Sequence, residues 1–201
     1  MKKQQIYILG ALCAVLLACG QDSEDATQAT IYEGSYQHDC HQESAGEDPT
    51  WNITTTLLSG NTISGVSESF SDSSCETRTN IVTVTGNIAL VEVATPAEVE
   101  GIDIEYTSAT MTLYGARSVT ESNDQEFFGY SDWEAGTPKD IFGRSILEGA
   151  DPFFGSGQTL HTLIDLVDNK LCFGEVTDEL DGSTAEKRPV AVDLDGCESR
   201  L

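Results

Sequence analysis

Apolar and polar residues alternate over most of the chain beyond residue 30, with the period of two that predicts β-strands. Many short strands separated by turn residues are typical of an antiparallel barrel or a barrel-like sandwich. The sequence therefore predicts one all-β domain over residues 31–201. The segments that show this alternation are 51–58, 62–70, 78–84, 88–93, 102–107, 110–114, 160–167, 170–173 and 190–194.

Turn residues divide these strands into hairpins. Gly60-Asn61 and Asp168-Asn169 consist of residue types that tolerate the positive φ angles of tight turns. Gly86-Asn87 has the same composition and is predicted as a third turn. The strands before and after each pair are expected to lie antiparallel.

Helix signals are few, so we expect long loops and one or two short helices. A capping pattern from Thr95 to Glu98 predicts a helix of about one turn. Residues 122–157 are expected to form loops, with a second short helix near Ile146. The strand pattern also predicts which side chains face the interior: Tyr36, Trp51, Ile53, Leu57, Ile81, Ile102, Ile104 and Leu171.

The N-terminus has a different pattern. Lys2 and Lys3 precede an apolar run over residues 6–18, and Leu16-Leu17-Ala18 stands directly before Cys19. The run is shorter than the ~20 residues that cross a bilayer, so a cleaved signal is favoured over a membrane helix.

This segment resembles the lipobox of bacterial lipoproteins. The resemblance implies that residues 1–18 are a signal peptide and that Cys19 is the lipid attachment site, with a diacylglycerol on its sulfur and an acyl chain on its amine. It also implies a lipid-anchored protein of the bacterial cell envelope, and Gly20 after the cysteine favours the outer membrane. Residues 19–30 are polar and aperiodic, and they are expected to be a flexible tether.

The net charge of −24 excludes some partners. Nucleic acid binding depends on neutralising phosphates, and docking on anionic lipid takes clusters of Lys and Arg, so neither is expected. Solubility explains the acidic surface, and attraction of a basic partner is the alternative. Membrane contact is therefore expected only through the lipid anchor.

Four cysteines follow the signal and the lipidated residue: Cys40, Cys75, Cys172 and Cys197. An even number of cysteines in an oxidising compartment predicts disulfides, here in one of three possible connectivities. We predict the two sequence-local links, Cys40–Cys75 and Cys172–Cys197.

No metal or other cofactor is expected. His38-Asp39-Cys40-His41 contains three ligand types, but on a regular strand His38 and Cys40 share one face and His41 lies on the other. The acidic segments 178–182 and 193–196 contain calcium-ligand residue types, but they lack the spacing of an EF-hand and are expected to be turns.

Catalytic patterns are not apparent in the sequence, so an enzyme is not expected. There is no nucleophile elbow, phosphate-binding loop or His-Glu-x-x-His motif. His161 lies among leucines and isoleucines and is expected to be a hydrogen-bonded structural residue.

Several short segments resemble a group of uncharacterised bacterial lipoproteins with a lipocalin-like β domain. In lipocalins an early tryptophan packs beneath a late basic residue. The resemblance implies that Tyr36 replaces this tryptophan and that Arg188 is the late cation, in a cation–π contact. The segments that carry the resemblance are 34–36, 71–75, 131–133, 139–143, 171–174 and 188–189, with Cys40 and Asp193-Leu194.

Two functions follow from a lipocalin-like barrel. A filled interior would indicate an interaction or structural domain that meets another envelope protein, and this is the favoured interpretation. A hollow interior would indicate a binder of an apolar small molecule. Aromatic residues in the loop region would then plug one end of the barrel or form a ligand rim, for which the candidates are Tyr130, Trp133, Phe153 and Phe154.

We predict that Cys19 anchors the protein. Replacing Cys19 with Ala removes the only sulfur at the lipobox, so the chain should move from the detergent phase to the aqueous phase on phase partitioning. A variant that stays in the detergent phase would contradict lipid attachment at this residue.

Overall fold

The computed structural model describes residues 31–44, 49–93, 99–146, 152, 154–155 and 157–201. The strands are β1 (Gly34–Ser44), β2 (Thr50–Ser59), β3 (Thr62–Phe70), β4 (Arg78–Val91), β5 (Glu100–Leu113), β6 (Pro138–Asp140), β7 (Thr159–Val167), β8 (Lys170–Phe173) and β9 (Glu198–Arg200). The helices are α2 (Ala116–Asp124) and the short 3₁₀ helices η2 (Phe127–Gly129) and η3 (Ala185–Lys187). The predicted signal, tether and capping pattern at Thr95 lie outside the described residues. Within the described ranges no helix has the length and hydropathy of a membrane span.

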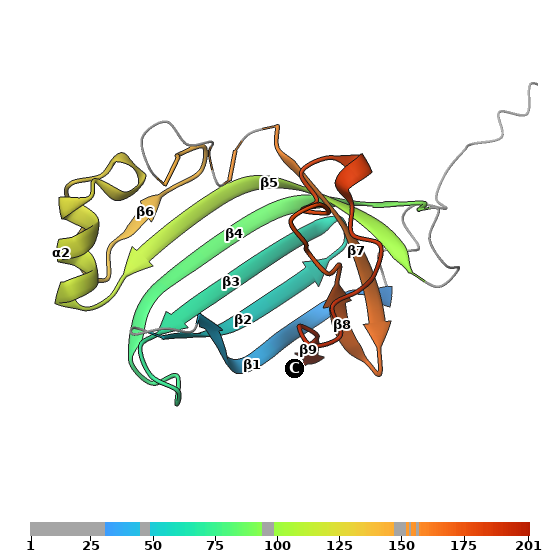
Figure 1. Cartoon of the computed structure of the whole chain (residues 1–201), viewed down its shortest axis with the longest axis horizontal. Coiled ribbons are helices and arrows are strands. Elements are labelled where there is room, and N and C mark those ends of the chain that lie inside the picture. The colour runs from blue at the N-terminus through green and yellow to red at the C-terminus, as the bar shows by residue number, and fades with distance from the viewer. Residues whose placement is uncertain (1–30, 45–48, 94–98, 147–151, 153, 156) are drawn as a thin grey trace, which may run out of the picture.

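Eight antiparallel strands close into a barrel, which confirms the all-β, single-barrel prediction. The ring runs β1-β2-β3-β4-β5-β7-β8-β9 and returns to β1 (Figure 1). Strand β6 pairs with the far half of β5, outside the ring. The long strands β1–β5 form a curved sheet, and the shorter β7–β9 cover one half of it (Figure 1).

Two of the three predicted turns are confirmed, and one is wrong. Ser59 pairs with Thr62, and Val167 pairs with Lys170, as tight hairpins require. Gly86, in contrast, lies inside β4 at a register shift, where a Cβ would lie 2.8 Å from the Glu105 carbonyl oxygen. A glycine is required at this position because β4 and β5 approach closely there, and not because the chain turns.

Two further elements differ from the prediction. Residues 190–194 form only an isolated bridge, between Val192 and Gly174, and the last strand is β9. Helix α2 was not predicted, because its sequence is polar and it buries no residue.

The interior face of β2 is the opposite of the one predicted. Asn52, Thr56 and Leu58 are buried, whereas Leu57 is 49 % exposed. The more apolar face of this strand, with Trp51, Ile53 and Leu57, points away from the interior, and a one-residue change of phase reverses every side chain. Trp51, Ile53 and Ile81 are accordingly only half-buried, while the predicted Tyr36, Ile102, Ile104 and Leu171 are buried.

The core has two parts. One cluster fills the barrel end near β7–β9 and includes Tyr36, Ile102 and Leu171. The other packs Phe128, Trp133 and the loop aromatics against the far end of β5. The space between them is lined by the middle of the strands.

The late cation over Tyr36 is Arg200, which corrects the expectation for Arg188. The Arg200 guanidinium lies 5.6 Å from the Tyr36 ring centroid, and its Nη2 donates to the Glu33 carbonyl oxygen at 2.6 Å. Tyr36 and Arg200 are paired across β1 and β9, which places them together. Arg188 lies on the other side of the barrel, against Ile102.

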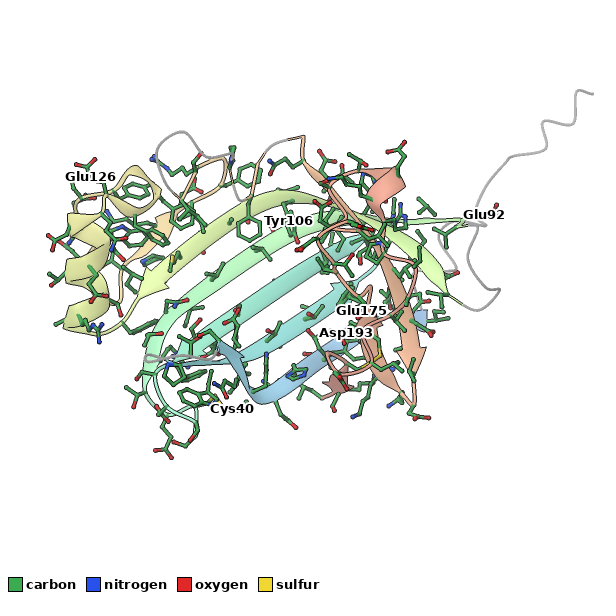
Figure 2. The ribbon with its side chains drawn as sticks, in the orientation of Figure 1. Cys40, Glu92, Tyr106, Glu126, Glu175 and Asp193 are labelled. Atoms are coloured by element: carbon green, nitrogen blue, oxygen red, sulfur yellow. A yellow bond between two sulfur atoms is a disulfide. The ribbon has the colours of Figure 1, made fainter. Side chains whose placement is uncertain are left out.

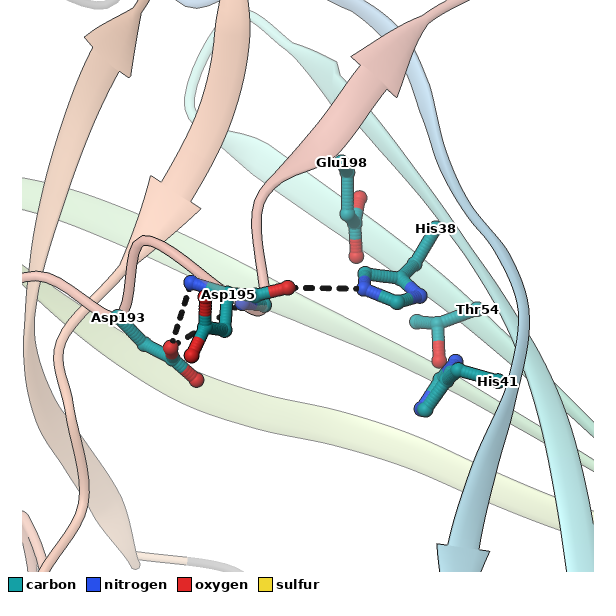
Figure 3. A pocket seen from close by; sticks show the side chains of 7 residues that line it. His38, His41, Thr54, Asp193, Asp195 and Glu198 are labelled. Carbon is teal, nitrogen blue, oxygen red and sulfur yellow. Dashed lines mark hydrogen bonds between the residues drawn. The ribbon is translucent and has the colours of Figure 1, made fainter.

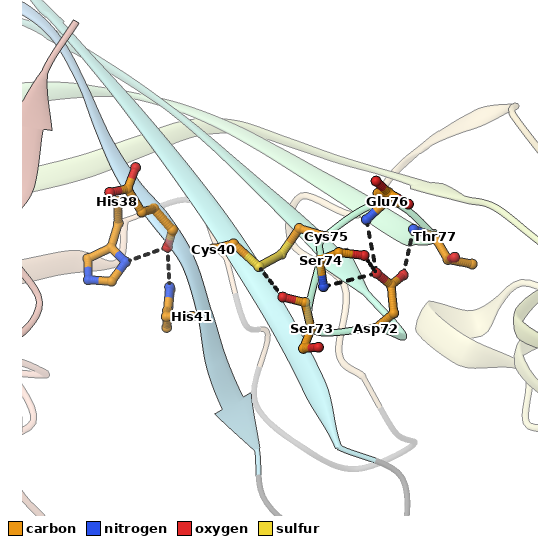
Figure 4. The surroundings of a disulfide bond; sticks show 10 residues. His38, Cys40, His41, Asp72, Ser73, Ser74, Cys75, Glu76 and Thr77 are labelled. Carbon is orange, nitrogen blue, oxygen red and sulfur yellow. Dashed lines mark hydrogen bonds between the residues drawn. A yellow bond between two sulfur atoms is a disulfide. The ribbon is translucent and has the colours of Figure 1, made fainter.

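Both predicted disulfides are confirmed: Cys40–Cys75 and Cys172–Cys197. The first ties β1 to the loop after β3 (Figure 4), where Asp72 accepts backbone hydrogen bonds from Ser74 and Thr77. The hydrogen bonds from the Ser74 side chain and the loop backbone hold the pKa of Asp72 well below its usual range. The second disulfide ties β8 to the residue directly before β9.

Replacing Cys172 and Cys197 together with Ala should destabilise the full chain. The link closes a loop between residues 25 apart in sequence, and its loss restores chain entropy to the unfolded state. We expect a loss of about 3 kcal/mol in the free energy of unfolding, measured by urea denaturation. An unchanged denaturation midpoint would show that β9 docks without the link.

Candidate binding cavity of the barrel

The inner face of the barrel encloses a mainly apolar cavity of about 260 Å³, which we call the apolar chamber. It lies where the two core clusters do not meet, and its apolar lining comes from five different strands and the C-terminal segment after β8. The residues that line it include Ile63, Val84, Ile104, Tyr106, Leu160, Phe173 and Pro189, with Gly65, Thr54, Thr56 and Glu198.

A second cavity of about 390 Å³, the polar chamber, adjoins the first. Its lining residues are His38, His41, Thr54, Asp193, Asp195, Gly196 and Glu198 (Figure 3). Thr54 and Glu198 line both chambers. The two chambers are therefore neighbours that share part of their walls at these side chains.

A bulge in β1 brings two histidines to the polar chamber. His38 pairs with Thr54 and His41 pairs with Asn52. Between these two pairs β1 advances by three residues while β2 advances by two. The extra residue returns His41 to the face of His38, which corrects the regular-strand expectation that they lie on opposite faces. The rings are 4.1 Å apart, and each Nδ1–H donates to the Asp39 carbonyl oxygen, at 2.9 Å and 3.0 Å.

Glu198 is the buried acid at the junction of the chambers. Its side chain points from β9 toward the space beside His38 and Thr54 (Figure 3), and the residue is 5 % exposed. Oε1 accepts a hydrogen bond from the Thr56 hydroxyl at 3.0 Å. Oε2 is buried and has no hydrogen-bond partner among the described residues.

Burial raises the pKa of Glu198 from 4.5 to about 7, although the Thr56 hydrogen bond and the nearby His38 oppose the rise. A carboxylate in a low-dielectric site loses hydration that one hydroxyl does not replace. Near neutral pH this group therefore exists in both protonation states, and a bound molecule can select one of them.

The C-terminal segment over residues 174–197 covers the strands β7 and β8 (Figure 2). Arg188 holds it in place: Nη1 donates to the carbonyl oxygens of Ile102 and Thr162, and Nη2 donates to Asp103 Oδ1 at 2.6 Å. His161 Nδ1 also lies 2.8 Å from Asp103 Oδ1, as expected of a hydrogen-bonded structural histidine. Burial opposes the ionisation of Asp103, but Arg188 and His161 hold its pKa below the usual value.

The acidic segments form turns, as expected. Asp193 Oδ1 accepts from the backbone N–H groups of Asp195 and Gly196, and Asp181 Oδ1 accepts from the Ser183 N–H. In the described part of the chain, no three His, Cys, Asp or Glu side chains are grouped so that they could hold a metal ion.

Two of the predicted rim residues are core residues instead. Trp133 is 2 % exposed and meets the Tyr130 ring edge-on at 5.6 Å. Tyr130 is flanked by Lys139 and Arg144, 4.6 Å and 4.2 Å from its centroid. These residues close the far end of the barrel and do not line the two chambers.

Phe154 lies closer to the cavity, because it meets Tyr106 edge-on at 5.1 Å. Tyr106 itself lines the apolar chamber, so Phe154 supports the chamber from behind. Phe153 lies outside the described residues.

Comparison with known proteins gives no relative. The chain matches no protein-family model, and no curated protein matches it at a significant level. Function is therefore inferred from the geometry of the barrel.

Replacing Glu198 with Gln should make stability less dependent on pH. The folded-state pKa of Glu198 lies above its unfolded value, so ionisation disfavours the folded state as pH rises from about 4.5 to 7. The variant should be about 3 kcal/mol more stable than the wild type near pH 8, and the difference should fade toward pH 4.5.

The measurement is urea denaturation of both full chains across this pH range. Glu179→Gln, at an exposed position, removes the same charge and serves as the control. A stabilisation that is equal at all pH values would contradict the assignment to Glu198 ionisation.

Proposed function

We propose that this protein is a lipid-anchored protein of the bacterial cell envelope, most simply of the outer membrane, whose barrel binds a small molecule with an apolar part. Anchoring rests on the lipobox at Cys19. Binding rests on one observation, the apolar chamber inside the barrel, which shares Thr54 and Glu198 with the neighbouring polar chamber.

The barrel interior supports binding over the filled core expected of an interaction domain. Eight-stranded barrels either fill their interior with side chains or hold one small ligand. Here small inward residues leave space in the middle of the barrel: Thr54, Thr56 and Gly65 face the bulkier Ile104 and Tyr106 across it. At about 260 Å³ the apolar chamber is slightly smaller than drug-sized sites, which occupy roughly 300–1,000 Å³, so it suits a ligand smaller than these.

An interaction domain is the second candidate, and a different feature supports it. A groove of about 930 Å³ runs between the end of β3–β5 and helix α2. Phe70 and Tyr114 line it, and the Arg78 guanidinium lies over both rings at 5.9 Å and 5.6 Å. Such a mixed aromatic and cationic surface is typical of protein–protein contacts.

Filling the boundary between the two chambers with a large side chain should abolish binding of a small ligand. Thr54→Trp places a large ring at the junction of the two chambers, whereas Thr55→Trp places the same ring on the neighbouring residue, on the other face of β2. Radiolabelled cyclohexylmethanol, a small neutral probe, should bind saturably to the wild type and to Thr55→Trp but not to Thr54→Trp.

Binding is measured by equilibrium dialysis of the lipidated protein in phosphatidylcholine vesicles, against vesicles alone. Circular dichroism of each variant verifies the fold. Failure of the wild type to bind any of the small probes used here and below would overturn the proposal and leave the groove beside α2 as the better-supported site.

A further inference from the structure

Glu198 has a buried carboxyl oxygen, Oε2, in a side chain that lines both chambers. A buried carboxyl normally has partners for both oxygens, because an unsatisfied buried acceptor costs free energy. Thr56 satisfies Oε1, and Oε2 is left without a partner among the described residues. Strand β9 is held on both sides, by β1 and β8, so the side chain cannot leave the interior without opening the barrel.

The residues that surround Glu198 are mainly threonines, histidines and acids. On β2 it faces Thr54 and Thr56, and on β8 it is paired with Leu171. On β1 the facing titratable groups are His38 and His41, and on the C-terminal segment they are Asp193 and Asp195. Asp181 and His161 line the apolar chamber. No Lys or Arg is among the described residues that line either chamber.

We propose that the ligand is a small amphiphilic amine whose ammonium group donates a hydrogen bond to Glu198 Oε2 while its apolar body occupies the apolar chamber. This inference rests on the proposed binding function and adds the chemical class of the ligand. The ammonium would enter past Asp193 and Asp195, and the apolar body would contact Ile104, Tyr106 and Phe173.

Three physical arguments favour an amine over other ligands. A hydrogen bond between an ammonium and a carboxylate is stronger than one between neutral groups. The ammonium also stabilises the ionised form of Glu198, whose burial otherwise disfavours it. The net charge of −24 raises the local concentration of cations and repels anions, which disfavours a carboxylate ligand.

Three probes of nearly equal shape separate these possibilities: cyclohexylmethylamine, cyclohexylmethanol and cyclohexanecarboxylate. Each is measured by equilibrium dialysis near pH 8 on the lipidated chain in phosphatidylcholine vesicles. The amine should bind roughly tenfold or more tightly than the alcohol, as a charge-assisted hydrogen bond implies, and the carboxylate should bind most weakly.

Two variants test whether Glu198 is the group responsible. Glu198→Gln keeps the size of the side chain and removes the charge, so the preference for the amine over the alcohol should fall to about twofold or less. Glu179→Gln removes an exposed charge and should keep the preference. Alcohol binding should be similar in all three proteins, which also reports that the variants are folded.

The pH dependence provides an independent readout. Lowering the pH to about 5 neutralises Glu198, so amine binding to the wild type should weaken while alcohol binding stays level. The pH dependence that remains in Glu198→Gln belongs to other groups and is subtracted.

The outcomes are distinct. If the alcohol and the amine bind equally well, the inference about the amine is overturned and the binding function stands; Oε2 then meets water only. If the carboxylate binds best, the inference is overturned in the same way. If none of the three probes binds, the binding function itself fails.

Discussion

Closure of the barrel by strand β9 is the constraint on which the rest of the structure depends. Only three residues, Glu198–Arg200, join β8 to β1, yet without them the sheet would be open between those strands. One covalent contact and one cation–π contact hold this short strand. The Cys172–Cys197 disulfide fixes its beginning to β8, and the Arg200 guanidinium covers the Tyr36 ring of β1 at its end.

The same short strand carries the acid at the centre of the cavity. A buried carboxylate without a full set of partners destabilises whatever element holds it. A three-residue strand could not by itself retain such a group, but the disulfide at Cys197 precedes Glu198 directly. The candidate site is thus maintained by covalent reinforcement at its weakest element.

Much of the fold could be predicted from the sequence, for identifiable reasons. Hairpins with Gly60-Asn61 and Asp168-Asn169 follow from local turn chemistry, and the two disulfides join residues that are close in sequence. The inward face of β2 could not be predicted, because its more apolar face points outward and only pairing with β1 and β3 decides the phase. Gly86-Asn87 was misassigned because the same two residue types are common in tight turns, whereas here they lie inside a paired strand.

The site was harder to predict than the fold. Glu198 is one of 34 acidic residues, and its burial results from pairing with β1 and β8, which the sequence does not display. The two histidines were noticed as a cluster, but a bulge brings them to one face, and a bulge depends on strand register. The one available signal was position, since Cys40 lies between the histidines and Cys197 lies directly before Glu198.

That arrangement has a consequence for how the polar chamber is held. Each disulfide is adjacent in sequence to residues that line the polar chamber: Cys40 lies between His38 and His41 (Figure 4), and Cys197 lies between Gly196 and Glu198. Oxidation of the four cysteines therefore fixes the backbone on both sides of this chamber covalently. The order of the chamber walls is thereby linked to the redox state of the chain.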